Sequence, residues 1–290
     1  MEKIFFYPRA IIAVFGVVVA LALFAFMFVG LSPGIEFTGG SILEVQYKEN
    51  RPSLSEVRSQ LAELGGEVMV QEVGEDGLVI RTTALGEETR ERTLTLLGEE
   101  AQEMRFESIG PVIGQELRGQ ALQISILAIL TIFLYIAFAF RHTSSVLMPW
   151  HYSGVSLIAL FHDMAVLLGF LSIAGLLWGV HVTVPIVVAF LIVFGYSINN
   201  TVVVFDRVRE NILRDRGDDF LSVVTASFRQ TLSRSINTSL TTLIVLVTIF
   251  LFGGETLAPF ALILIVGITV GTLSSLFLAP AALLLFYNKK

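Results

Sequence analysis

The sequence contains no cysteine and little charge: only 15% of its 290 residues are Asp, Glu, Lys or Arg, against about a quarter in soluble domains. Without cysteine, thiol chemistry, iron–sulfur ligation and disulfide bonds are excluded. The histidines show no metal-ligand spacing; they are His142, His151, His162 and His181. We therefore expect neither a cofactor nor a metal ion.

Hydrophobic residues dominate instead. They make up 54% of the chain, and the mean hydropathy is +0.77. Apolar runs recur, and a run of about 20 residues is long enough for a helix to cross a bilayer. The sequence therefore predicts a polytopic α-helical membrane protein with six transmembrane helices, at approximately 10–31, 121–140, 155–177, 184–204, 236–252 and 258–286.

Basic residues in the short connections predict the orientation of these helices. The connections around 175–182 and 253–259 contain no Lys or Arg. Six spans then place both termini and every basic flank in the cytoplasm. These flanks contain Lys3, Arg9, Arg141, Arg207, Arg209, Arg214, Arg216, Arg229, Arg234, Lys289 and Lys290.

Three regions follow from this topology: a first transmembrane helix (1–31), an external domain (32–118), and a five-helix membrane domain (119–290). The last includes a cytoplasmic loop over 205–234, which has helical character and could lie along the membrane surface as an amphipathic pair. The external segment has a net charge of −9, against −6 for the whole chain. Its acidity favours solubility as the explanation over a binding role.

The external segment alternates between strand and helix patterns. Strands are predicted over 41–47, 67–73, 78–82 and 105–109, and helices over 53–64 and 87–103. The order β-α-β-β-α-β is typical of a ferredoxin-like α+β domain. Because the segment contains no histidine, no cysteine and only one aspartate, we expect it to contact polypeptide or a partner domain rather than to catalyse a reaction.

Polar residues inside the spans are the default functional candidates, because lipid offers them no partners. Asp163 lies near the middle of the third span. A buried carboxyl hydrogen-bonded to a neighbouring helix explains it as well as a functional role does. In the last span, Gly267, Gly271 and Ser275 are spaced for close packing against another helix.

Five further polar residues lie in or near the fourth and fifth spans, and each has a structural explanation beside a functional one. Asn199 and Asn200 can hold helices together. Asp206 and Arg207 fit an ion pair at the membrane boundary. Arg234 can extend toward the cytoplasmic headgroups.

These residues belong to motifs that resemble the SecF family, the smaller membrane subunits of the bacterial SecDF protein-export complex, which are of the RND type. One motif is Gly34-Ile35-Glu36-Phe37-Thr38-Gly39-Gly40, which follows the first span. The others are His162-Asp163, the segment Gly195–Asn211, Gln230-Thr231-Leu232-Ser233-Arg234, and Phe252-Gly253-Gly254. The order of one span, an external ferredoxin-like domain and five more spans agrees with one half of an RND-type transporter.

The resemblance implies a partner and an energy source. SecF pairs with SecD in a twelve-span unit of the bacterial inner membrane, which uses the proton-motive force to help SecYEG export preproteins. The resemblance also implies other Sec accessory subunits as partners. It implies no binding of nucleic acid. In the family, a carboxylate of the fourth span conducts protons together with an arginine of the fifth, here Arg234. Asp163 is a further candidate, and Asn199, Asp206, Arg207, Gly39 and Gly40 support the motifs.

The chain departs from the family pattern at Asn200, where an acidic residue is expected. An amide cannot exchange a proton near neutral pH. Either this chain has lost the carrier, or the substitution was introduced deliberately, or protons use another group. The intact surrounding motif favours a deliberate substitution.

Two other functions remain open at this stage. An RND-type exporter of lipids or small molecules would also need a second half. A scaffold without transport activity would not need polar residues at mid-membrane in two spans.

Overall fold

The structure, a computed structural model, describes residues 5, 7–48, 51–64, 68–74, 76–83, 86–139, 148–214 and 219–286. The chain divides into two compact units. The membrane unit comprises Met1–Leu31, Ile124–Val180 and Pro185–Lys290, and the external unit comprises Ser32–Gln123 and His181–Val184. The connection between the third and fourth spans therefore contributes residues to the external unit.

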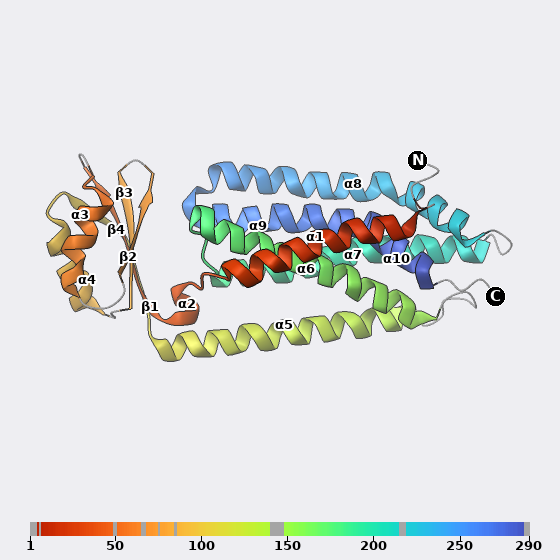
Figure 1. Cartoon of the computed structure of the whole chain (residues 1–290), viewed down its shortest axis with the longest axis horizontal. Helices are drawn as coiled ribbons and strands as arrows, with labels where there is room; N and C mark the ends of the chain where they lie inside the picture. Colours follow the sequence, from red (N-terminus) through yellow and green to blue (C-terminus); the bar gives the residue numbers. More distant parts are fainter. Residues whose placement is uncertain are drawn as a thin grey trace. The chain divides into compact units, whose positions relative to one another are not determined.

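The external unit contains a four-stranded antiparallel sheet with two helices on one face (Figure 1). Its strand order, β2-β3-β1-β4, is that of a ferredoxin-like fold, as the sequence predicted. The elements are α2 (Ile35–Thr38), β1 (Gly40–Tyr47), α3 (Leu54–Leu61), β2 (Val68–Val73), β3 (Gly77–Thr82), α4 (Glu87–Leu97) and β4 (Ala101–Ile109).

The core of the external unit lies between the sheet and the helices. Alternate residues of the strands point into it, among them Val45 of β1 and Leu78 of β3, and they pack against Val57 and Leu61 of α3. A capping box begins α3: Glu56 accepts a 2.9 Å hydrogen bond from the backbone N–H of Ser53.

Two boundaries differ from the sequence prediction. The helix predicted to reach Glu103 ends at Leu97, and the strand predicted from Arg105 begins at Ala101. Gly98 ends the helix because it adopts a φ of +88°, which side-chain-bearing residues rarely adopt. The residues beyond it then pair with β1, beginning with Ala101 opposite Tyr47.

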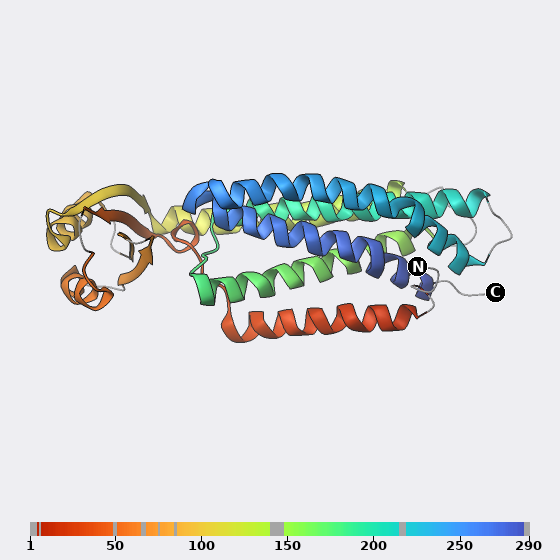
Figure 2. The same ribbon diagram turned by 90° about the horizontal axis from the view of Figure 1, so that it is seen from above.

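The membrane unit is a helical bundle (Figures 1 and 2), and each of the six candidate spans overlaps a predicted one. Helix α1 lies at the side of the bundle against α6, where Gly169 allows close packing: a Cβ there would lie 2.5 Å from the backbone oxygen of Ala22. The helices that lie wholly or partly in this unit are α1 (Pro8–Val29), α5 (Pro111–Ala139), α6 (Pro149–Trp178), α7 (Val184–Arg214), α8 (Phe220–Phe252), α9 (Gly254–Leu273) and α10 (Ala279–Phe286). A short π-helical segment, Ser274–Leu278, joins the last two.

Several helices are longer than their predicted spans. Helix α5 begins at Pro111, so the predicted boundary between 118 and 119 falls inside a helix. The predicted loop over 205–234 is mostly the end of α7 and the start of α8. These ends pack against one another in the core of the bundle, through residues such as Val208 of α7 and Val224 of α8, and so do not form a separate surface pair.

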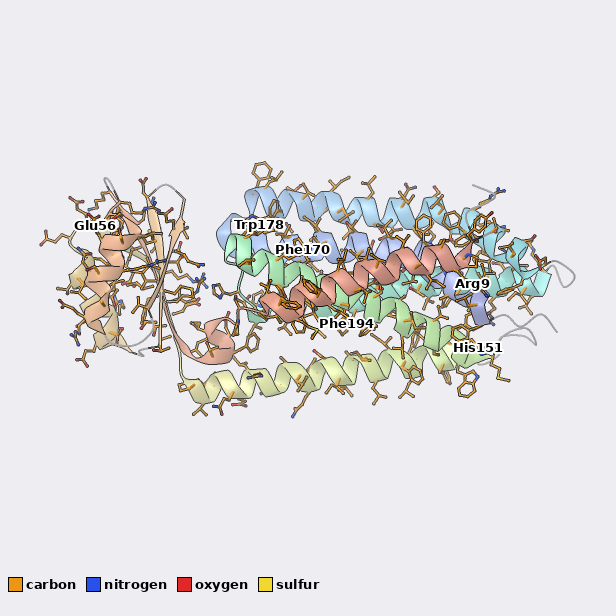
Figure 3. The ribbon with its side chains drawn as sticks, in the orientation of Figure 1. Arg9, Glu56, His151, Phe170, Trp178 and Phe194 are labelled. Carbon is orange, nitrogen blue, oxygen red and sulfur yellow. The ribbon has the colours of Figure 1, made fainter. Side chains whose placement is uncertain are left out.

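Helices α1 and α6 begin at the same end of the membrane unit. Figure 3 shows Arg9 and His151, near the starts of these helices, at one end and Trp178, the last residue of α6, at the other. We call the first the arginine end, because Arg207 of α7 and Arg234 of α8 also lie there, around a shared cavity. The predicted basic flanks Lys3, Arg141, Arg216, Lys289 and Lys290 lie outside the described residues, as does His142.

Candidate functional site

Asp163 lies on α6 inside the membrane unit, and its side chain is fully buried. Oδ1 lies 2.9 Å from Nδ1 of the adjacent His162, and Oδ2 accepts a 2.5 Å hydrogen bond from Ser197 of α7. Both carboxylate oxygens are therefore satisfied by protein groups, as a carboxyl within a span requires. Among the described residues, His162 and Asp163 are the only buried Asp, Glu, His, Lys or Arg side chains.

His162 is also buried, with 4% of the residue's surface exposed. Its ring lies 5.0 Å from that of Phe15 on α1, measured between centroids. Its second nitrogen, Nε2, is buried and makes no hydrogen bond. The pair thus contains two groups that can bind a proton, one of which has an unused nitrogen.

Helix α9 approaches this pair closely because it carries glycine there. A Cβ on Gly271 would lie 3.2 Å from the Cβ of Ser197 and 3.4 Å from Oδ2 of Asp163. One turn away, a Cβ on Gly267 would lie 2.4 Å from Val193. Ser275 then bonds to the backbone oxygen of Ser197 at 3.2 Å. The predicted small-residue motif therefore packs against α7, as expected.

Asn200 begins a second chain of hydrogen bonds, which joins α7, α9 and α8. Its side chain is 3% exposed and donates to Thr272 at 3.4 Å. Thr272 lies 2.7 Å from the hydroxyl of Ser239, which also accepts a 3.0 Å hydrogen bond from Tyr196. All members of this chain are hydroxyls or amides, so none of them changes charge near neutral pH.

Arg234 lies elsewhere. It is exposed on α8 and lines a cavity of about 450 Å³ at the arginine end of the bundle. No hydrogen bond joins it to Asn200 in the part of the chain that the structure describes. The cavity is lined by Tyr135, Ala139, Val202, Val203, Asp206, Arg207, Arg209, Glu210, Gln230, Thr231 and Arg234.

The remaining predicted residues occupy three places. Asp206 and Arg207 face the cavity, but their ion pairs are to Arg209 (3.8 Å) and Glu210 (2.6 Å) and not to each other. Asn199 is exposed on the outer face of α7 and is not part of the buried network.

Gly39 and Gly40 lie in the external unit, where they fold the chain between α2 and β1. Both have positive φ, +75° and +132°. Added Cβ atoms would lie 2.9 Å from Pro111 and 2.8 Å from the backbone oxygen of Thr82, respectively. These two glycines therefore serve the backbone path.

Sequence reasoning missed several members of the buried network. In the sequence, His162 stands out only as part of a motif, and no pattern assigns a role to Ser197, Ser239 or Thr272. A signal was present: Thr231, Ser235 and Ser239 recur every four residues along α8 and share its buried face. In the described ranges, no three His, Asp or Glu side chains come close enough to hold a metal ion.

Comparison with known proteins gives the family. A family model for "Protein export membrane protein SecD/SecF, C-terminal" matches residues 89–290, and one for the "SecD/SecF GG Motif" matches residues 24–50. The SecF subunit of Thermobaculum terrenum is 38% identical over 90% of this chain and 86% of its own length. That of Desulfurispirillum indicum is 37% identical over 95% of this chain and 88% of its own length.

Solved structures agree. The crystal structure of SecDF from Thermus thermophilus, described as a translocon-associated membrane protein, superposes with a TM-score of 0.85 at 31% identity. A SecDF in a super-membrane-facing form gives 0.70 at 32% identity. Each match covers 97% of this chain but only 38% of the solved chain.

Six spans, one external ferredoxin-like domain and a polar site buried among the helices define one half of an RND-type membrane transporter. The family model covers more than half of the chain, and the relatives match along most of their length. The chain belongs to the SecF family of protein translocase subunits.

Proposed function

We propose that the chain is the SecF half of a SecDF-type unit that uses the proton-motive force to assist preprotein export through SecYEG. The observation that carries the proposal is the buried Asp163, bonded to His162 and, across the helix interface, to Ser197. A carboxyl group inside a span is costly and marks ion or proton pathways. The surrounding hydroxyls and amides cannot carry a proton's charge, whereas the Asp163–His162 pair can.

A proton on Asp163 changes the contacts between three helices. The ionised carboxylate holds the Ser197 hydroxyl as a charge-assisted hydrogen bond, which is stronger than a neutral one. Protonation removes that charge and weakens the link between α6 and α7. Gly271 of α9 lies so close to both residues that an added Cβ would touch each of them. These helices would thus have two arrangements, and binding or release of one proton would shift the bundle from one to the other.

Asn200 and Arg234 have separate roles in this proposal. Asn200 connects α7 to α9 through Thr272 and leaves proton binding to Asp163. Arg234 stands at the cavity, where we place the exchange of protons with the cytoplasm. The carboxylate–arginine coupling that the resemblance implies would need an acid at position 200 and a movement of α8 relative to α7.

The proposed location is the bacterial inner membrane, with both termini in the cytoplasm. The arginine end of the bundle then faces the cytoplasm, as the distribution of basic residues favours. Among the described residues, the arginines of this end are Arg9, Arg207, Arg209, Arg214, Arg229 and Arg234.

SecD is the proposed partner. The solved SecDF chains are much longer than this one, which leaves room in them for a second half. The outer faces of two helices also need cover, because Asn199 on α7 and Asn237 on α8 are exposed amides in apolar segments. An amide facing hydrocarbon lacks hydrogen-bond partners, which a helix of SecD would supply.

Translocation into membrane vesicles that contain SecYEG, SecD and this chain tests the function. We expect a proton gradient to increase preprotein export beyond the ATP-driven level, and an ionophore to return it to the level of vesicles without this chain. Equal export with and without the gradient would refute the proposal. Gradient-driven efflux of a lipid or small molecule, with export unchanged, would favour the exporter half instead.

A further inference from the structure

The connection between α6 and α7 is fastened to the external unit by backbone hydrogen bonds. The N–H of Val182 donates to the backbone oxygen of Ser32 at 2.8 Å, and the N–H of Gly34 donates to that of Val182 at 2.7 Å. Pro33 and Val182 thereby form a parallel bridge. The two helices that carry Asp163 and Ser197 are thus joined by a segment that is part of the external unit.

Glycine is needed at position 34 for this contact. A Cβ there would lie 2.9 Å from the backbone oxygen of Val182 and 2.5 Å from Oε2 of Glu36. The carboxylate of Glu36 therefore lies directly beside the fastened segment. Substituting Gly34 would force both the segment and the carboxylate to move.

Three ionisable side chains meet at this junction, each with buried polar atoms that make no hydrogen bond. They are Oε2 of Glu36 on α2, Nε of Arg81 on β3, and both ring nitrogens of His181. Another part of the Arg81 guanidinium donates to Gln71 of β2, which fixes the side chain on the sheet. Unsatisfied buried groups of this kind are costly, so a small change in charge can alter whether the segment stays bound.

We propose that His181 is a positioning residue that fastens the α6–α7 connection to the external unit when its imidazole is neutral and releases it when the imidazole is protonated. In the fastened state, the positive charge of Arg81 repels the protonated imidazole of His181, and the negative charge of Glu36 partly offsets this repulsion. The use of such a switch rests on the proposed function. A gradient that is acidic outside would protonate His181 and release the α6–α7 connection, which joins the two helices of the proton site.

The electrostatics of the junction give the direction of this response. Burial lowers the pKa of His181, and the positive charge of Arg81 lowers it further. The backbone of Pro33 raises this pKa, but by less than burial lowers it. Burial also lowers the pKa of Arg81, whereas the negative charge of Glu36 raises it. Glu36 therefore acts on Arg81, and Arg81 acts on His181. The imidazole therefore binds its proton more weakly in the fastened state than in the released state. The fastened state is favoured at pH values above the ordinary histidine pKa of about 6.5, and it loses stability as the pH falls below that value.

Amide hydrogen exchange of the purified chain tests the proposal without SecD, SecYEG or a gradient, so its failure is distinct from failure of the proposed function. Exchange is followed in peptides that contain Ser32–Gly34 and His181–Thr183 and is corrected for the intrinsic effect of pH. Between pH 7.5 and 5.5, we expect the opening equilibrium of this junction to rise by up to about tenfold, the limit for a histidine that protonates only when released.

Variants separate His181 from other titrating groups. His181→Gln should remove the pH response, and Arg81→Gln should reduce it because the repulsion is lost. His151→Gln, which changes a histidine of the membrane unit, should leave the response intact. A junction that opens equally at both pH values in the unchanged chain, or a response that persists in His181→Gln, would overturn the proposal. The first result needs no variant to fold.

Discussion

Ser197 of α7 donates a 2.5 Å hydrogen bond to Oδ2 of Asp163 on α6, where both side chains are almost completely buried. This bond joins two spans through Asp163, the only Asp or Glu in the described part of the chain whose whole side chain is buried. Any change in the charge of Asp163 therefore changes the attraction between α6 and α7. The proposed mechanism depends on this relationship more than on any other contact.

Ser197→Ala should lower the stability of the folded chain and abolish the increase in export that the proton gradient causes. The carboxylate loses its donor from α7, which we expect to cost about 1–2 kcal/mol of stability. Thermal unfolding in detergent and gradient-dependent export both measure the effect. Ser156→Ala is the matched control, because this buried serine of α6 donates to the backbone oxygen of Tyr152 in its own helix and makes no other hydrogen bond among the described residues. Equal effects of the two substitutions would contradict the role of Ser197.

Gly267→Ala should be strongly destabilising, because the new methyl group would lie 2.4 Å from Val193. Overpacking of this kind typically costs about 1–3 kcal/mol. Val193→Ala in the same chain should recover much of the loss by making room. Gly195→Ala is the control, since a Cβ there meets nothing within 4 Å. The measurement is the melting temperature of each variant; a Gly195→Ala loss as large as that of Gly267→Ala would count against the packing described.

Asn199→Leu together with Asn237→Leu should make the isolated chain more stable and its assembly with SecD weaker. Leucine removes the cost of exposing an amide to lipid or detergent, and it also removes a polar contact for the partner. Size-exclusion profiles report the first effect and the yield of co-purified SecD the second. Unchanged co-purification would show that these faces do not contact SecD.

Asn200→Asp should increase gradient-dependent export, because it adds a second group that can bind a proton beside the network around Asp163. The gain should disappear when the gradient is collapsed. It should also require Arg234, so Arg234→Ala in the Asn200→Asp chain should remove it. If the Asn and Asp forms export equally under a gradient, position 200 has no part in proton transfer.

The external domain was largely predictable from the sequence, because strand alternation and the capping box at Ser53 are local signals. The exact end of α4 was not, since the backbone angle of Gly98 and the pairing of Ala101 with Tyr47 depend on the folded sheet. The six spans followed from apolar run length. The extension of α7 and α8 beyond their predicted limits depends on packing between these two helices, which hydropathy does not report.

The candidate site was only partly predictable for the same reason. Asp163 stands out in the sequence as a charge within a span, and the structure bonds it to His162 and to Ser197. Its partner Ser197 is 34 positions away, and serine is common in spans, so nothing local identifies it. Asn200 likewise bonds to Thr272, 72 positions away on α9, and no local pattern identifies that partner.

Infrared difference spectroscopy of the chain assembled with SecD in proteoliposomes tests the central claim, that Asp163 takes up and releases the proton, most directly. A proton gradient, acidic outside, is imposed across the membrane, and the spectra recorded with and without it are subtracted. We predict that the C=O stretch of a protonated carboxyl appears in the unchanged chain and in the control Asp219→Asn, which alters an exposed aspartate at the start of α8, and is absent from Asp163→Asn. The same band in Asp163→Asn, or no band in the unchanged chain, would contradict the account.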